Sequence, residues 1–448
     1  MTYQYYIETL GCSKNFVDSE IMMGRLTKAA YRQVFDPALA DIIIVNTCGF
    51  IESAKEESLD TIFELLDYKE RGNCRYFIVA GCLSQRYAAE LAAEIPQIDA
   101  FVGTTTFDDI VDVVKKLQVA KGDATLYIDN CDRVTLDDGV RRIAKGAVTG
   151  YLKISEGCDN RCTYCIIPKL RGRYRSRTIE SIVAEAKQMV AAGISELIVI
   201  AQDTSRYGID IYGTYKLLDL LRELNALNGI RWIRLQYMYP DILDETVISG
   251  IAELDKVVNY FDIPVQHGSN AVLKRMNRNT SVEHIESVIQ AIRKHCPAGT
   301  VRTTMIVGFP GETEADFEAM IGFVKRVRFD RLGAFVYSRE EDTPAYNMPN
   351  QVAGDVAAAR YAELMTVQQA ISESLQALKR DTHCAVLIEE VVEENNIYVA
   401  RTAYDAPEID GVCYVHSHGK QLASGDFVTV KITDTLEFDI IGDYVEHC

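Results

Sequence analysis

Long apolar runs are missing from this sequence of 448 residues: no stretch of about 18 apolar residues occurs, so no membrane span is expected. Glycine and proline are sparse, at 28 and 10 residues, which excludes collagen-like and disordered composition. Residues 1–7 show no basic stretch followed by an apolar one, so we expect a first strand there rather than a signal peptide. With 48% apolar residues, the chain is long enough to bury the cores of two or three domains.

Basic residues are also in deficit, because 47 lysines and arginines oppose 65 aspartates and glutamates and leave a net charge of −18. The deficit is uneven: from Asp381 to Cys448, three basic residues oppose fourteen acidic ones, a net charge of −11. Phosphate repels an acidic surface, so nucleic acid is a poor default partner. A basic protein suits this charge better, since opposite charges steer association.

Cysteine, in contrast, is abundant, with 12 residues. Disulfides are the first alternative, but we expect this chain to be cytoplasmic, where thiols stay reduced. Metal or iron–sulfur ligation is therefore the better prediction for the clustered cysteines. The cysteines outside any pattern are expected to be free thiols: Cys74, Cys131, Cys296, Cys384, Cys413 and Cys448.

The first 120 residues alternate strand and helix patterns, which is typical of a parallel α/β domain. Strands are expected at 3–9, 42–45 and 76–80, and helices at 17–26 and 58–68. The three strands are each followed closely by a cysteine: Cys12, Cys48 and Cys82. Ligands of open α/β sheets bind at the carboxyl ends of the strands, so these thiols can converge. Taken alone, they could equally be small buried residues.

A second series of strands follows residues 121–146, which we interpret as a linker with one short strand at 124–128. Its six strands are expected at 151–155, 197–201, 233–238, 260–265, 301–307 and 332–337. Six strand–helix repeats predict a partial barrel over residues 147–380, with its chemistry at the carboxyl ends of the strands. A long helix at 354–379 and short alternating strands at 381–448 then predict a small closed β-barrel.

Three cysteines follow the first strand of the second series with the spacing C-x3-C-x2-C: Cys158, Cys162 and Cys165. A closed zinc site needs four protein ligands, and no nearby histidine supplies the fourth. Three thiolates can instead hold a 4Fe–4S cluster and leave one iron open to an outside ligand. Structural zinc and unrelated free thiols are the weaker alternatives.

This motif, with Tyr164 as its aromatic residue, resembles the radical S-adenosylmethionine (SAM) superfamily. The resemblance implies that SAM binds the open iron and is cleaved by one electron to a 5′-deoxyadenosyl radical, which attacks an unactivated C–H bond. Tyr164 and residues after later strands resemble SAM contacts of the superfamily: Tyr164, Gln202, Asp203, Gln266, Gly308 and Glu312. Ordinary strand-to-helix turns are the alternative explanation for this set, and His267 could be a loop histidine.

Three further segments resemble the methylthiotransferase family of radical SAM enzymes: Leu10-Gly11-Cys12-Ser13-Lys14-Asn15, Asn46-Thr47-Cys48-Gly49-Phe50 and Ala80-Gly81-Cys82. The resemblance covers essentially the whole chain. It implies an N-terminal cluster domain, a radical SAM barrel and a C-terminal TRAM barrel. It also implies a second 4Fe–4S cluster on Cys12, Cys48 and Cys82, two SAM molecules, a low-potential electron donor of the flavodoxin or ferredoxin type, and a sulfur source.

Residues 11–20 resemble the family members that methylthiolate the β-carbon of an aspartate in ribosomal protein S-12. The tRNA-modifying members usually carry Gln-Met-Asn or Lys-Val-Asn after the first cysteine. The acidic C-terminal segment favours the basic ribosomal protein and makes tRNA a weaker candidate. Methylthiolation of a tRNA adenosine stays the alternative, and a non-catalytic iron–sulfur or RNA-binding scaffold is an alternative of another class.

A basic strip after the cysteine motif favours a phosphate-bearing partner such as RNA instead. Five cations lie within nine residues after the cysteine motif: Lys169, Arg171, Arg173, Arg175 and Arg177. The strip could bind phosphate, neutralise the carboxylate of SAM, hold an acidic substrate side chain or be a solvated loop.

Overall fold

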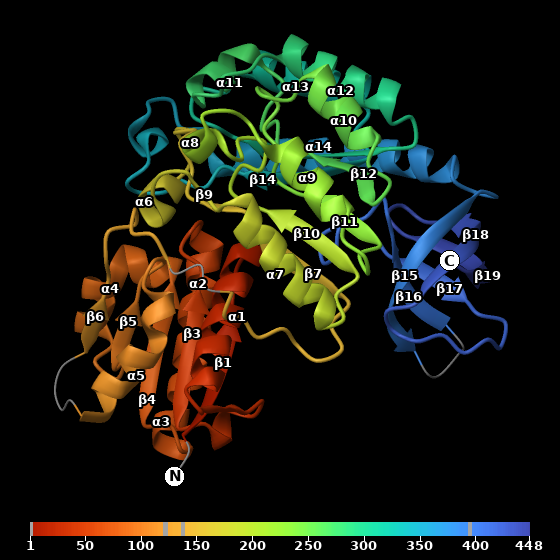
Figure 1. Cartoon of the computed structure of the whole chain (residues 1–448). Helices are drawn as coiled ribbons and strands as arrows, with labels where there is room; N and C mark the ends of the chain where they lie inside the picture. Colours follow the sequence, from red (N-terminus) through yellow and green to blue (C-terminus); the bar gives the residue numbers. More distant parts are fainter. Residues whose placement is uncertain (1–2, 120–123, 136–138, 393–396) are drawn as a thin grey trace.

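Two parallel sheets and one closed barrel follow one another along the chain (Figure 1). This computed structural model describes residues 3–119, 124–135, 139–392 and 397–448. Within those residues, no helix combines the length and apolar character needed to cross a membrane. The α/β class with a small C-terminal β-barrel, expected from the sequence, is confirmed.

The N-terminal sheet has parallel strands in the order β2-β1-β3-β4-β5-β6. Their bounds are β1 Gln4–Thr9, β2 Arg32–Gln33, β3 Ile42–Thr47, β4 Tyr76–Gly81, β5 Ala100–Val102 and β6 Thr125–Tyr127. Strand β5 has only three residues, which is too short for its apolar pattern to predict a strand. Strand β6, which we placed in the linker, is the edge strand of this sheet.

Helices cover both faces of this sheet, so β3 is buried along its whole length. They are α1 Ser13–Lys28, α2 Glu52–Leu66, α3 Tyr68–Arg71, α4 Cys82–Glu94 and α5 Ile110–Val119, with 3-10 turns η1 Pro37–Leu39 and η2 Phe107–Asp109. Apolar residues of α1 and α5 pack on one face, and those of α2 and α4 pack on the other. Helix α2 begins six residues before the predicted start at 58, because its first turns are polar and show no apolar period.

The central sheet is parallel and open, with the strand order β14-β13-β12-β11-β10-β7 that a partial barrel requires. Its strands are β7 Thr149–Lys153, β10 Glu196–Ile200, β11 Trp232–Leu235, β12 Val257–Asp262, β13 Thr300–Val307 and β14 Arg331–Val336. The helices between them are α6 Ile167–Arg171, α7 Ile179–Ala191, α8 Ile209–Tyr212, α9 Leu217–Asn225, α10 Glu245–Ala252, α11 Asn270–Arg275, α12 Val282–His295 and α13 Glu314–Val327. A 3-10 turn, η3 Pro344–Asn347, follows β14.

The long helix α14 Gly354–Ala377 leads into a closed barrel with the strand order β15-β16-β17-β19-β18. Its strands are β15 His383–Val392, β16 Ile397–Thr402, β17 Cys413–His416, β18 Phe427–Thr435 and β19 Ile440–His447. Strand β19, which the sequence did not predict, closes the barrel by pairing with both β17 and β18.

The two outer units contact opposite ends of the central sheet. The N-terminal unit lies beside the carboxyl ends of the strands of the central sheet. There, Lys55 and Arg86 both contact the buried Glu340, which follows β14. The C-terminal barrel packs against the amino ends, where Trp232 meets Phe427 edge-on at 4.9 Å. The chemistry expected at the carboxyl ends therefore lies at the interface with the N-terminal unit.

Candidate functional site

Turns at the carboxyl edge of the N-terminal sheet carry three predicted ligands: Cys12, Cys48 and Cys82. Gly11 precedes the first at φ +85°, and a Cβ there would lie 2.8 Å from the Cβ of Cys48. Gly81 precedes the third at φ +93°, and a Cβ there would lie 2.4 Å from Asn46 Oδ1. Both positions need glycine, for the turn and for the approach of the neighbouring turn.

Asn15, which sequence reasoning did not single out as a site residue, ties the three turns together. Its Nδ2 donates to the carbonyls of Leu10, at 3.0 Å, and Thr47, at 2.9 Å. Its Oδ1 accepts a hydrogen bond from Arg171 at 2.5 Å and lies 3.8 Å from the sulfur of Cys82. Asn15 is fully enclosed, so it holds all three cysteine turns in one arrangement.

The three thiols are within electrostatic reach of one another. Burial raises the pKa of Cys82 to about 12 against the opposing charge of Arg171, and the thiols of Cys12 and Cys48 raise it further. Burial also raises the pKa of Cys48. Cys12 caps α1 and Cys82 begins α4, so the helix N-termini favour negative sulfur. Such thiols become thiolates when a metal centre displaces their protons.

The second cysteine triad lies on the loop between two short strands, β8 Ser155–Glu156 and β9 Arg175–Ser176, which pair as an antiparallel ribbon. The N–H of Cys158 donates to Gly172 at 3.0 Å, and that of Cys165 donates to Cys162 at 3.0 Å. Burial raises the pKa of Cys158 to about 12, and the Cys162 thiol adds to the effect. The sequence spacing and the ribbon together hold these three thiols in one loop.

Two side chains that the sequence did not single out lie against Cys162. The Tyr239 hydroxyl is 3.0 Å from its sulfur, and Arg278 Nη1 is 4.0 Å from it. The Arg278 guanidinium stacks over the Tyr239 ring at 3.9 Å and donates to the Pro264 carbonyl at 2.6 Å. Nothing in the local sequence marks either residue, because both come from distant loops at the strand ends.

The loop after β11 contacts the segments that carry both triads. Tyr239 contacts Cys162, while the ring of Tyr237 lies 2.9 Å below the ammonium of Lys14, two residues after Cys12. Tyr237 has φ +61°, which is strained for a residue with a side chain, and its N–H donates to Asp262 at 2.9 Å. Backbone strain of this kind is typical of functional loops.

The predicted SAM contacts divide into two groups. Tyr164 and Gln266 line a cavity of about 270 Å³ at the strand ends, together with Phe50 of the N-terminal unit. The apolar side chains of Ile306 and Phe335 form much of its remaining wall. A largely apolar wall suits a site that must limit water.

The other four predicted contacts do not line this cavity. Asp203 accepts hydrogen bonds from Asn160, at 2.7 Å, and Ser205, at 2.5 Å, and so supports the cysteine loop. Glu312 binds Arg360 at 2.9 Å and lies 3.4 Å from the buried His267.

The remaining two contact neighbouring segments rather than open space. Gln202 donates to Glu156 at 2.7 Å. A Cβ at Gly308 would lie 2.6 Å from the Cβ of Ala357, so this glycine allows the approach of α14.

The basic strip does not form one surface. Arg171 is 1% exposed and binds Asp18, at 2.7 Å, and Glu156, at 3.2 Å. It also donates toward the sulfur of Cys82 at 3.7 Å. Lys169 is exposed and pairs with Asp342. Arg171 is therefore not part of a solvated loop, because its guanidinium is enclosed and bound to two carboxylates.

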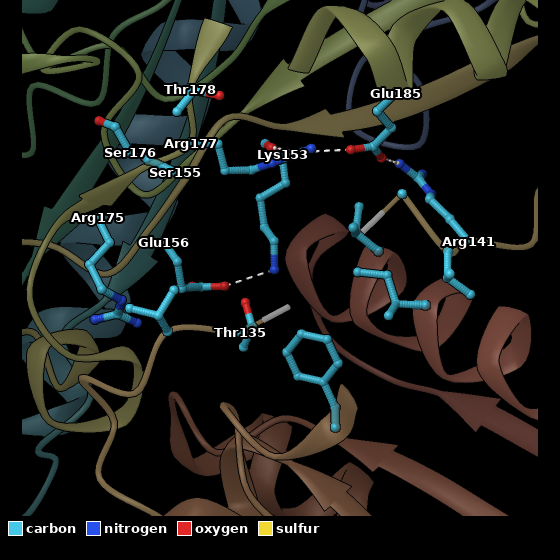
Figure 2. A pocket seen from close by; sticks show the side chains of 16 residues that line it. Thr135, Arg141, Lys153, Ser155, Glu156, Arg175, Ser176, Arg177, Thr178 and Glu185 are labelled. Atoms are coloured by element: carbon cyan, nitrogen blue, oxygen red, sulfur yellow. Dashed lines mark hydrogen bonds and ion pairs between the residues drawn. The ribbon is translucent and has the colours of Figure 1, made fainter. Parts of the chain in front are cut away.

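Charged residues also line a cavity of about 210 Å³ between the two units (Figure 2). In Figure 2, Lys153 reaches Glu156 at 2.8 Å, and Glu185 lies between Arg141, at 2.8 Å, and Arg177, at 2.5 Å. The Arg141–Glu185 pair joins the linker to α7, and Lys153 of β7 also binds Asp18 of α1 at 2.6 Å.

Both triads consist of three thiols, the donor type that holds iron–sulfur clusters. Over the described ranges, no three cysteine, histidine or acidic side chains are close enough to share a single metal ion. Each thiolate of a cubane binds a different iron, so a cluster does not need that geometry. In type and number of donors, each triad matches a cluster with one iron that lacks a protein ligand.

Comparisons with known families match three parts of the chain. Residues 152–324 match the radical SAM superfamily, and residues 382–445 match the TRAM domain. Residues 4–103 match the uncharacterized protein family UPF0004.

Relatives match nearly the whole chain. The ribosomal protein uS12 methylthiotransferase RimO of Clostridioides difficile strain 630 is 50% identical, and the match covers 98% of each chain. RimO of Desulforamulus reducens is 45% identical over 98% of each chain. Among solved structures, the radical SAM methyltransferase TsrM of Kitasatospora setae aligns with a TM-score of 0.57 at 15% identity over 77% of each chain, which shows a shared fold.

Proposed function

Because the chain belongs to the RimO family of radical SAM methylthiotransferases, we propose that it transfers a methylthio group to an aspartate of ribosomal protein uS12. The product carries SCH3 in place of one hydrogen on the β-carbon. As a radical SAM enzyme, the chain uses a 4Fe–4S cluster and SAM. A second cluster, a second SAM, a low-potential electron donor and a sulfur source complete the proposal, together with a cytoplasmic location.

The observation that carries the two-cluster proposal is that one loop, the loop after β11, contacts the segments of both triads. Lys14 follows Cys12 and lies on Tyr237, while Tyr239 of the same loop touches Cys162. In this proposal, the triad of Cys158, Cys162 and Cys165 holds the cluster that binds SAM, and the triad of Cys12, Cys48 and Cys82 holds the other. When bound, these groups supply the carbon-directed radical and the sulfur.

The residues of the chain prepare this site in several ways. Asn15 keeps the three N-terminal turns together, and the β8–β9 ribbon keeps the second triad in its loop. Tyr239 and Arg278 direct a hydroxyl and a cation toward Cys162, which lowers the energy of negative charge on its sulfur. The mostly apolar wall of the cavity beside Tyr164 limits the number of groups there that can hold water.

Protein rather than tRNA is the proposed substrate, because the C-terminal barrel is acidic and ribosomal proteins are basic. The test is anaerobic reconstitution with a uS12 peptide and a tRNA stem-loop offered in parallel. Mass spectrometry should find the methylthio group on the peptide aspartate. A methylthio group on the tRNA adenosine alone would instead favour the alternative.

Iron content tests the second cluster. The reconstituted chain should bind about eight irons, as two cubanes require. Cys48→Ala should lose about four of them, while Cys74→Ala, a buried cysteine outside both triads, should lose none. Full iron content in Cys48→Ala would contradict the second cluster.

A further inference from the structure

Lys14 is a buried cation without an ion partner. Its side chain comes from the first turn of α1, and the residue is only 6% exposed. The ammonium lies 2.9 Å from the centre of the Tyr237 ring, a cation–π contact at the interface between the two units. Among the residues that the structure describes, no acceptor forms a hydrogen bond or an ion pair with it. Buried ammonium groups normally have an anionic partner.

The nearby carboxylates are already bound to other cations. Asp262 pairs with Arg302 at 2.8 Å, and Arg302 also lies 3.6 Å from Asp410. Glu156 pairs with Lys153 at 2.8 Å and Arg171 at 3.2 Å.

Asp18 is shared in the same way, because it also binds both Lys153 and Arg171. The two carboxylates of Asp18 and Glu156 therefore balance the charges of two cations, Lys153 and Arg171. Lys14 is a third cation in this neighbourhood, and neither of these carboxylates forms an ion pair with it.

We propose that Lys14 is the residue that receives the side-chain carboxylate of the substrate aspartate. This inference rests on the proposed function. The β-carbon that is modified is bonded directly to the carboxyl carbon, so a cation that holds the carboxylate also positions the reacting carbon. Lys14 is two residues from Cys12, and Cys12 belongs to the triad whose cluster is proposed to supply the sulfur. Tyr237 fixes the ammonium in the absence of substrate.

Carboxylate preference is the measurable consequence. The native holoenzyme should bind a uS12 peptide with its target aspartate about 10- to 100-fold more tightly than the same peptide with asparagine, since a buried charge-assisted hydrogen bond has that effect. Lys14→Gln should bind both peptides with nearly equal affinity. Lys14→Arg should keep the preference, and so should Lys28→Gln, which changes an exposed lysine at the end of the same helix.

Three measurements separate the competing explanations. A preference that persists in Lys14→Gln overturns the inference. Loss of SAM binding with an unchanged peptide preference would assign Lys14 to the carboxylate of SAM, and loss of about four irons with an unchanged preference would assign it to the cluster; each overturns the inference. If the native holoenzyme binds neither peptide, the proposed function itself fails.

A measurement on the native chain does not depend on how the variants fold. Carbodiimide coupling of the aspartate peptide to the holoenzyme should form an amide between the target aspartate and Lys14, which peptide mapping can locate. Coupling only to Lys55 or Lys153, the other lysines at this interface, would contradict the inference.

Discussion

Single buried arginines lie against one sulfur of each cysteine triad. Arg171 Nη2 is 3.7 Å from Cys82, and Arg278 Nη1 is 4.0 Å from Cys162. The two arginines are buried at 1% and 5% exposure. A cation beside a thiolate offsets the negative charge that three such ligands bring into a dry interface. Arg171 also neutralises Asp18 and Glu156, so it has a structural role that can be measured without a cluster.

Replacing Arg171 should therefore destabilise the chain. Arg171→Met leaves Asp18 and Glu156 with Lys153 as their one remaining shared cation within the described structure, and the cost of breaking a buried pair is about 3–5 kcal/mol. Denaturant unfolding of the metal-free chain should show this loss. Arg173→Met, at an exposed position of the same strip, should change the apparent free energy of unfolding very little. Equal unfolding midpoints for the two variants would refute the structural role.

At the scale of elements, a buried charge cluster joins β10 and β11 to β16. Glu196 is fully buried and binds Arg234 at 3.0 Å and Arg401 at 3.1 Å. Burial raises the pKa of Glu196, but the two arginines outweigh that effect and leave it below the ordinary value of 4.5. The C-terminal barrel is attached to the central sheet partly through this carboxylate.

The depressed pKa gives this attachment a pH dependence. Because the folded pKa is lower than the unfolded one, the stabilisation is fully present above about pH 4.5 and is lost as the pH falls through the folded pKa. Glu196→Gln should cost about 3–5 kcal/mol at pH 7, and its difference from the native chain should shrink in acid. Denaturant titrations from pH 7 to pH 3 measure this, with the exposed Glu446→Gln as the control. A difference that is constant with pH would rule out the charge as its cause.

At the scale of the whole molecule, part of the acidic charge of the C-terminal barrel is internal. Asp405 binds Arg331, and Asp410 lies 3.6 Å from Arg302, so these two acids face the central sheet rather than a partner. Glu389 is likewise bound to Arg401. The charge available for docking therefore comes from the exposed acids, and a test of docking has to leave the internal pairs intact.

Reversal of exposed acids tests the docking role. Changing Glu390, Glu408 and Glu446 to lysine should weaken binding of uS12 about tenfold at low salt, since long-range attraction controls the association rate. The matched control changes three exposed acids of the N-terminal unit to lysine: Glu90, Glu94 and Asp112. Surface plasmon resonance at two salt concentrations measures both sets. Equal affinity of the two triple variants would contradict a specific role for the barrel.

Local patterns predicted the parts of this protein whose physics is local. The buried strands β3 and β4 follow from apolar runs, and the turns before Cys12 and Cys82 follow from φ values that only glycine adopts easily. The spacing from Cys158 to Cys165 is likewise a local property. Strands β5 and β19 were missed because their pairing partners, rather than their own residues, make them strands. The domain boundaries that we placed at 120, 146 and 380 stay predictions.

The sequence by itself determined the spacing of Cys158, Cys162 and Cys165 and the position of the other three thiols just after parallel strands, because residue type and strand pattern are local properties of the chain. Only the tertiary structure decided what surrounds those thiols. Arg171 at Cys82, Arg278 and Tyr239 at Cys162, and the unpaired Lys14 on Tyr237 come from segments far apart in sequence. Contacts among the loops at the strand ends, within the central unit and between it and the N-terminal unit, bring these residues together, and no local sequence pattern predicts such contacts.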